Sequence, residues 1–193
     1  MTVLELLKNA SFYLNLDTEF APYFDESSTV TPTDETQREW EKMLRAFNSL
    51  IKSIATERIP VTKEEEILFD CDGEFLLSTL TEKFHSLQTI TGYSGFVFAS
   101  LTNDGKLKAN YVGPAVMKYA YVPEDFTTED DISVFDGVLN DLVFSYGIAY
   151  VYCEMSALYD DAEMWKEKFV SAINDCMSGV VRDRVMRVRR WLY

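Results

Sequence analysis

The residues best suited to chemistry form one short string, Asp70-Cys71-Asp72-Gly73, which follows the apolar run Ile67-Leu68-Phe69. A carboxylate can act as a nucleophile when a Mg²⁺ ion keeps it deprotonated and orients it. Asp-Gly between two apolar runs is also the ordinary signal for a hairpin turn. The string therefore has a catalytic and a purely structural interpretation.

The same string resembles the first motif of the haloacid-dehalogenase-like phosphotransferases, an apolar strand that ends in Asp-x-Asp-Gly. The resemblance implies a Mg²⁺-dependent phosphohydrolase with Asp70 as the nucleophile and Asp72 as the acid and base. The later lysine and acidic pair of that family match only loosely, to Lys106 and to Asp130-Asp131. That family places its motif at the start of an α/β sheet, whereas here helical patterns precede the string and strand patterns follow it. We keep this function as an alternative and expect no catalytic residue, metal site or cofactor.

Other reactive groups are few. His85 is the only histidine, and its segment predicts a partly exposed strand residue. The spacing of Cys71, Cys153 and Cys176 matches neither a disulfide framework nor a metal site, which favours buried free thiols. The run Glu129-Asp130-Asp131 could hold a cation, but acidic residues are also favoured in the first turn of a helix. We interpret it as a helix start.

Charge is distributed very unevenly along the chain. The net charge is −14, yet residues 182–193 hold five of the eight arginines and carry +4, which leaves −18 on residues 1–181. An acidic body repels DNA phosphates, so sequence-reading DNA binding is not expected. The acidity also suggests a further alternative, an inhibitor that mimics DNA and binds a host protein.

The basic end alternates arginines with large apolar residues. Trp, Tyr and Arg dominate the energetics of protein interfaces, so this end is predicted to bind another protein. We expect Trp191 to be the anchor. The predicted partner-binding residues are Arg184, Arg187, Arg189, Arg190, Trp191, Leu192 and Tyr193.

These residues must be positioned by a small set of elements. Thr2 and Glu5 form a capping box that opens a first helix, and residues 17–33 are expected to be a turn-rich connection. A second helix begins at Thr31 or Thr33 and stops before Pro60. Further helices are expected from Thr128 to Cys153 and after Asp160, and short strand patterns fill residues 61–122, with hairpin signals at Asp72-Gly73 and Asn103-Asp104-Gly105.

The expected fold is mainly α, a four-helix bundle with an antiparallel β insertion between the second and third helices and an extended C-terminal arm. The bundle would comprise residues 1–60 and 123–181, the insertion residues 61–122, and the arm residues 182–193. No basic, apolar and small-residue pattern of a signal peptide opens the chain, so we expect a cytosolic protein. No membrane partner is expected.

Seven landmarks occur in a fixed order along the chain. The landmarks run over nearly the whole chain and end in an Arg-Arg-Trp sequence. They are Ile54-Ala55-Thr56-Glu57-Arg58-Ile59-Pro60, Thr62-Lys63-Glu64-Glu65-Glu66-Ile67-Leu68-Phe69, Tyr119-Ala120-Tyr121-Val122-Pro123, Thr128-Glu129-Asp130-Asp131, Gly147-Ile148-Ala149-Tyr150-Val151-Tyr152-Cys153, Asp161-Ala162-Glu163-Met164-Trp165 and Arg189-Arg190-Trp191.

In this order, the landmarks resemble those of the head-to-tail connector, or adaptor, proteins of tailed bacteriophages. The resemblance implies a non-enzymatic structural subunit of the virion. Such proteins form a homo-oligomeric ring, usually of twelve subunits, beneath the portal protein, and they extend the DNA channel toward the tail or a second connector. Their C-terminal segments dock on the portal or on neighbouring subunits. The protein would then occur at the head-tail interface of the virion and in the host cytoplasm during assembly, close to genomic DNA without sequence-specific binding.

Overall fold

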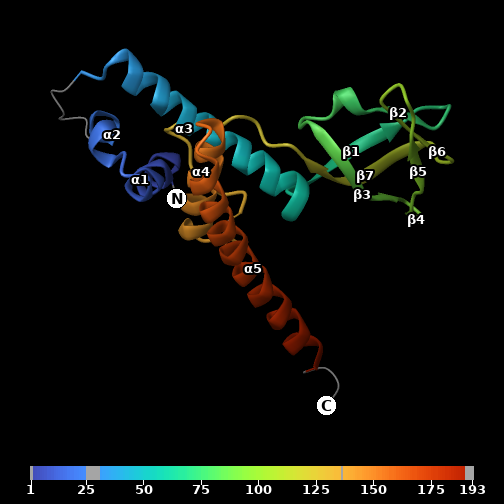
Figure 1. Cartoon of the computed structure of the whole chain (residues 1–193). Helices are drawn as coiled ribbons and strands as arrows, with labels where there is room; N and C mark the ends of the chain where they lie inside the picture. Colours follow the sequence, from blue (N-terminus) through green and yellow to red (C-terminus); the bar gives the residue numbers. More distant parts are fainter. Residues whose placement is uncertain (1, 25–30, 136, 190–193) are drawn as a thin grey trace. The chain divides into compact units, whose positions relative to one another are not determined.

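The structure is a computed structural model, shown in Figure 1, that describes residues 2–24, 31–135 and 137–189, with side chains in the last helix as far as Ser178. These residues form five α-helices and two antiparallel sheets with seven strands, 48% helix and 24% strand. The expectation of a mainly α four-helix bundle is therefore wrong. The reason is that the strands are not a minor insertion, because they build two sheets around a core of their own.

The chain divides into two compact units. The helical unit comprises Met1–Leu50 and Asp125–Tyr193, and the β unit comprises Ile51–Glu124. The boundaries expected from the sequence lie at residues 60/61 and 122/123. The β unit thus interrupts the helical unit along the sequence.

Helix α1 (Val3–Tyr13) begins at the predicted capping box. The Glu5 amide donates to the Thr2 hydroxyl at 3.2 Å, and the Thr2 amide donates to the Glu5 carboxylate at 3.1 Å. Helix α2 (Asp17–Phe24) lies where we expected only a connection. It forms because Phe20 is fully buried and its ring meets that of Trp40 edge-on at 5.4 Å, a long-range contact that outweighs the turn signals.

Helix α3 (Asp34–Ser53) starts as predicted after Thr33, whose hydroxyl accepts the Thr36 amide at 3.2 Å. A π-helical turn, Ile54–Arg58, ends the helical segment before Pro60. An apolar stripe at helical spacing is buried from Trp40 onward, through the rest of the helix and into the π-helical turn. Its buried members are Trp40, Met43, Phe47, Leu50, Ile51, Ile54 and Ala55.

The third predicted helix begins later than expected. The Thr127 amide and hydroxyl both donate to the Asp130 carboxylate, at 2.6 Å and 2.8 Å, which closes a local turn in place of a helix start. Helix α4 (Asp141–Met155) is capped instead by Asn140, whose side chain accepts the Val143 amide at 3.1 Å. Most of α4 is buried, so the prediction of a central helix is confirmed from residue 141 onward.

Helix α5 (Tyr159–Arg189) packs on α4, and the close-packed centre includes a glycine. A Cβ added to Gly147 would lie 2.6 Å from a Leu50 methyl carbon and 3.1 Å from the Phe169 ring. Glycine therefore lets α4 approach both α3 and α5 closely. The extended arm expected over residues 182–193 is wrong for 182–189, because these residues continue α5; residues 190–193 lie outside the described part of the chain.

The β unit holds a four-stranded sheet of order β1-β7-β3-β4 and a three-stranded sheet of order β2-β6-β5. The hairpin predicted at Asn103-Asp104-Gly105 is confirmed, with the Thr102 amide donating to the Lys106 carbonyl at 2.8 Å. The turn at Asp72-Gly73 instead joins strands of different sheets. The strands are β1 (Thr62–Phe69), β2 (Glu74–Leu76), β3 (Phe84–Gly92), β4 (Gly95–Phe96), β5 (Ala99–Leu101), β6 (Lys106–Ala109) and β7 (Gly113–Tyr121).

A single apolar core stabilises the β unit. Its centre is Tyr119, which is fully buried and donates a hydrogen bond to Glu65 at 2.9 Å. Burial alone raises the pKa of the Tyr119 hydroxyl, and the bond to the carboxylate raises it further. The buried members of this core are Ile67, Phe69, Ile90, Leu107, Ala109, Ala115, Met117 and Tyr119.

Candidate interaction site

The C-terminal half of α5 extends beyond the packed part of its helix. Among the α5 side chains described, the last buried one is Ile173, and those from Asn174 to Ser178 are exposed or half-buried. The helix continues for residues 174–189, a length of about 24 Å at 1.5 Å per residue. Helices in proteins gain most of their stability from packing, so residues 174–189 are the candidate segment for contact with another molecule.

The predicted partner-binding residues fall at this end of the chain. Arg184, Arg187 and Arg189 occupy helical positions in α5, whereas Arg190, Trp191, Leu192 and Tyr193 lie outside the described residues. Valines recur at positions 181, 185 and 188, spacings of four and three that share one side of a helix. The partner-binding role of these residues stays a prediction, now with a helical framework for three of them.

The root of α5 is fixed by an aromatic cluster. The ring centroids of Tyr13, Tyr146 and Trp165 lie 5.3 Å to 5.8 Å apart, joining α1, α4 and α5. The Lys168 ammonium lies 4.1 Å from the Trp165 ring centroid, within cation–π range. Tyr150 stacks on Phe169 at 6.4 Å one turn further along. These contacts hold the start of α5 and thereby set the direction in which its second half projects from the helical unit.

A polar network ties α3 to α4. The Tyr152 hydroxyl donates to the Glu39 carboxylate at 2.7 Å, and Lys42 donates to the same carboxylate at 2.7 Å. Burial raises the pKa of Tyr152 far above its ordinary value, and the neighbouring Glu39 raises it further. Burial would also raise the pKa of Glu39, but the hydrogen bonds from Lys42 and Tyr152 outweigh it and hold that pKa below its usual range. The network stabilises packing and leaves no poised acid or base.

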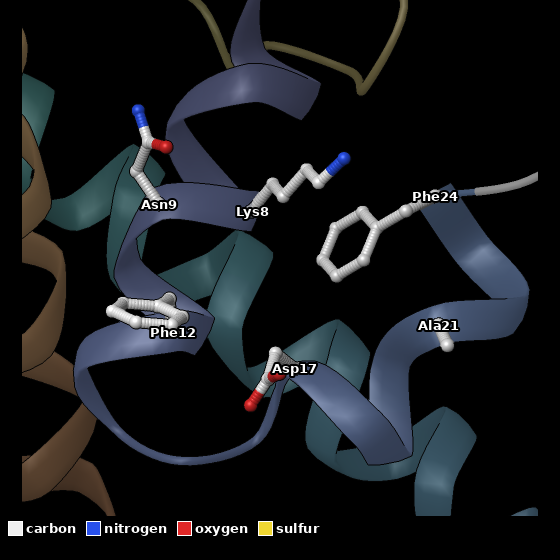
Figure 2. Close-up of a pocket in the computed structure, with 6 residues that line it drawn as sticks. All are labelled: Lys8, Asn9, Phe12, Asp17, Ala21 and Phe24. Atoms are coloured by element: carbon white, nitrogen blue, oxygen red, sulfur yellow. The ribbon is translucent and has the colours of Figure 1, made fainter.

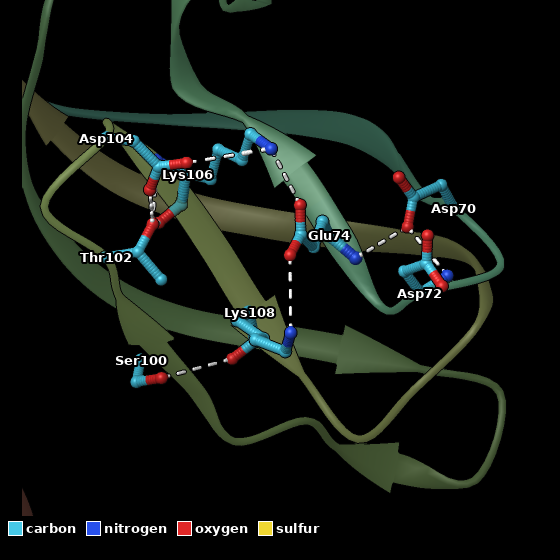
Figure 3. A network of polar contacts seen from close by, with 8 residues as sticks. All are labelled: Asp70, Asp72, Glu74, Ser100, Thr102, Asp104, Lys106 and Lys108. Atoms are coloured by element: carbon cyan, nitrogen blue, oxygen red, sulfur yellow. Dashed lines mark hydrogen bonds and ion pairs between the residues drawn. The ribbon is translucent and has the colours of Figure 1, made fainter.

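Figure 3 shows the surroundings of the Asp70-Cys71-Asp72-Gly73 string in the β unit. Asp70 is exposed, and one carboxylate oxygen accepts the amides of Asp72 and Glu74 at 3.0 Å and 2.8 Å. Lys106 pairs with Glu74 at 2.8 Å, and Lys108 pairs with the same carboxylate at 3.3 Å. Hydrogen bonds from these two lysines hold the pKa of Glu74 below its ordinary value. The Asp70 carboxylate closes its own turn, and the lysine proposed for phosphate chemistry pairs with a different residue.

The remaining candidate groups are scattered. His85 and Cys71 are exposed, and Asp130 accepts its hydrogen bonds from Thr127. Cys153 is buried, and burial raises the pKa of its thiol to about 11. Across residues 2–24, 31–135 and 137–189, no three His, Cys, Asp or Glu side chains are arranged to hold a metal ion.

A surface hollow of about 540 Å³ lies between α1 and α2 (Figure 2). Lys8 extends toward the ring of Phe24, with 6.0 Å between its ammonium and the ring centroid. Phe12 at the rim is 68% exposed. The sequence did not lead us to expect this hollow. The available signal was Phe12, an apolar residue that lies outside the helical spacing of the other apolar residues in the first helix. In the part of the chain that the structure describes, no helix has the length and apolar character needed to cross a membrane.

The search for known relatives yields no assignment: the chain matches no protein-family model and no curated protein. The functional argument therefore depends on the residues of the chain itself. Among its described features, the projecting half of α5 with its basic sequence is the one that most clearly calls for another molecule.

Proposed function

We propose that the protein is a structural subunit of the head-to-tail joint of tailed bacteriophages, acting without catalysis. In this role it forms a ring beneath the portal protein and around the DNA channel. Its C-terminal helix docks on the portal or on a neighbouring subunit. The order of sequence landmarks suggests the family, and the C-terminal helix and the charge distribution of the chain support the role.

The observation that carries the proposal is the second half of α5. Sixteen helical residues follow the last buried side chain described in that helix, and four of them are arginines, at positions 182, 184, 187 and 189. The chain before residue 182 carries −18, a charge opposite to that of this segment. The segment is therefore attracted to acidic surfaces. Complementary charge guides association and selects partners, which suits a docking element.

The acidic body supports the channel role. Residues 119–165 contain eleven Asp or Glu and no Lys, Arg or His. A surface of this sign repels the DNA backbone and lets DNA pass without binding. The phosphohydrolase alternative gains no support, because Asp70 caps its own turn and Lys106 pairs with Glu74.

The test is made in the virus whose genome encodes this chain. Deletion of residues 182–193 is expected to yield DNA-losing or tailless heads, because the docking element is gone. Arg58→Glu is the matched control: it alters an exposed arginine outside the basic end and is expected to leave assembly intact. Normal particles from the deletion, or equal defects from both changes, would contradict the proposal.

A further inference from the structure

The outer face of the four-stranded sheet has one polar end and one apolar end. The pairing register aligns Glu64 with Lys118, and these two side chains form an ion pair at 3.1 Å. One row further, the register aligns Glu66 with Val116 and places Thr91 beside Val116 on the other side. The face thus changes from a row with a neutralised ion pair to a row in which Glu66 lies beside Val116 and has no basic residue opposite it.

Large apolar side chains extend this second row. Phe96 pairs in register with Thr91, and Leu68 pairs with Pro114. Tyr93 is 87% exposed, Phe96 75% and Leu68 65%. We call Leu68, Tyr93, Phe96 and Val116 the outer patch. Exposed aromatic groups gathered in this way mark interaction sites more often than ordinary surface.

The outer patch borders a hollow that carries an acid. The hollow measures about 390 Å³ and its lining includes Tyr93, Val116 and Glu66. The Glu66 side chain is exposed, and its carboxylate has no hydrogen-bond or ion-pair partner in the described part of the chain. A complementary ligand would bring an aromatic group for the hollow and a cation for Glu66 and the aromatic faces.

We propose that the outer patch binds the basic C-terminal segment, residues 182–193, of a second copy of this chain. That segment carries +4 and ends in Arg-Arg-Trp-Leu-Tyr, and it is the only part of the sequence that combines clustered cations with a terminal pair of aromatics. A tryptophan enters the hollow while an arginine pairs with Glu66. Two copies joined patch to patch would bring their Glu66 carboxylates together, which disfavours that arrangement.

The contact joins two different surfaces, so each copy offers one of each. Heterologous interfaces of this kind close into rings when the rotation between subunits permits. The inference rests on the docking role proposed for the C-terminal segment and names the surface that the segment binds. It also gives a function to the exposed aromatics of the β unit, which the portal-binding role leaves without one.

The first test titrates a peptide of residues 182–193 into an isotope-labelled chain that ends at residue 181. All buried residues in the described structure precede residue 174, so the shortened chain keeps its core. Amide shifts are expected at Thr91, Phe96 and Val116, saturating below about 1 mM. Phe96→Ser is expected to weaken binding by about tenfold or more, and Glu66→Gln by about threefold.

Phe12→Ser serves as the control, since it removes an exposed aromatic from the helical unit and should not change binding. Shifts confined to other surfaces, or no saturation up to about 1 mM, would overturn the proposal. Failure here alongside a defective deletion virus would leave the proposed function standing and reject only this surface.

The second test uses sedimentation of the full chain. Association is expected to grow with concentration, and to be lost both in Phe96→Ser and in the chain ending at residue 181. Mixed together, those two defective chains each retain one working surface and should form a 1:1 dimer that grows no further. A full chain that stays monomeric while the peptide binds would mean docking within one copy, and self-association of the shortened chain would mean contact between like surfaces. Either result would overturn the proposal.

Discussion

Tyr152→Phe tests how α3 and α4 are held together. The substitution keeps the ring and removes only the hydroxyl that donates to Glu39 at 2.7 Å. Tyr152 is 6% exposed, so water cannot freely replace this bond. A hydrogen bond to a charged group contributes about 1.5–3 kcal/mol, and Glu39 keeps its contact with Lys42, so we expect a loss of about 1–2 kcal/mol. For a chain of this size, that corresponds to roughly 2–8 °C in Tm.

Urea denaturation followed by tryptophan fluorescence is the appropriate assay. Trp40 and Trp165 lie in the helical unit, and the sequence of the β unit contains no tryptophan, so the signal follows the helical unit. Tyr150→Phe is the matched control, because that hydroxyl bonds Glu154 at 2.9 Å on the exposed surface of the same helix. Tyr150→Phe is expected to lower the free energy of unfolding by less than about 0.5 kcal/mol.

The pH dependence gives the same experiment a second readout. The pKa of Tyr152 is raised in the folded protein, so its contribution is complete below the ordinary value of 10.0 and declines as the pH rises above it. The pKa of Glu39 is lowered, so the network also weakens as the pH falls below 4.5. The difference between wild type and Tyr152→Phe should therefore be largest between these limits. Equal losses from Tyr152→Phe and Tyr150→Phe would refute this reasoning.

Three further predictions concern the β unit and the thiols. Gly73→Ala should lower the free energy of unfolding by several times the roughly 1 kcal/mol expected for Gly105→Ala, as measured by urea unfolding followed by near-UV circular dichroism. Both glycines have positive φ, but only at Gly73 would an added Cβ lie against the Ala109 carbonyl oxygen. Equal costs would count against this close approach. Glu74→Gln should reduce the loss of unfolding free energy at acid pH, measured by the same assay repeated at several pH values. The reason is that the lowered pKa of Glu74 gives stability that is lost as the pH falls below 4.5. An unchanged loss in the variant would contradict this. Iodoacetamide at pH 8 should label exposed Cys71 and spare Cys153, whose pKa is raised to about 11, as read by mass spectrometry; labelling of Cys153 in the folded protein would show that it is not buried.

Local interactions made several elements predictable. The capping box joins Thr2 and Glu5, which are three positions apart, and the buried stripe of α3 repeats at helical spacing, so both could be read directly from the sequence. A strand residue was expected at His85, and β3 contains it, but two bulges, at residues 84–86 and 87–89, break the two-residue alternation that would mark the full strand. Helix α2 was missed because its burial depends on Trp40, which is distant in sequence.

The candidate site was only partly predictable. The clustered arginines identified the basic end. They did not predict that α5 continues through Arg189, because the basic end has no clear helix start or stop signal of its own. The run Phe96-Val97-Phe98 is one of the short strand patterns within residues 61–122. In the structure Val97 packs against the core while Phe96 and Phe98 are 75% and 91% exposed. Periodicity gives the two faces of a strand but not which face meets the core.

The most direct test of the account compares binding to portal-bearing capsids by the full chain and by the chain ending at residue 181, with the unfolding free energy of each measured by tryptophan fluorescence. We predict that the shortened chain loses binding by tenfold or more, a change of about 1.4 kcal/mol or more. Its unfolding free energy should stay within about 0.5 kcal/mol of the full chain, the range of changes made away from structural contacts. Undiminished binding by the shortened chain would contradict the claim that the C-terminal helix is the docking element.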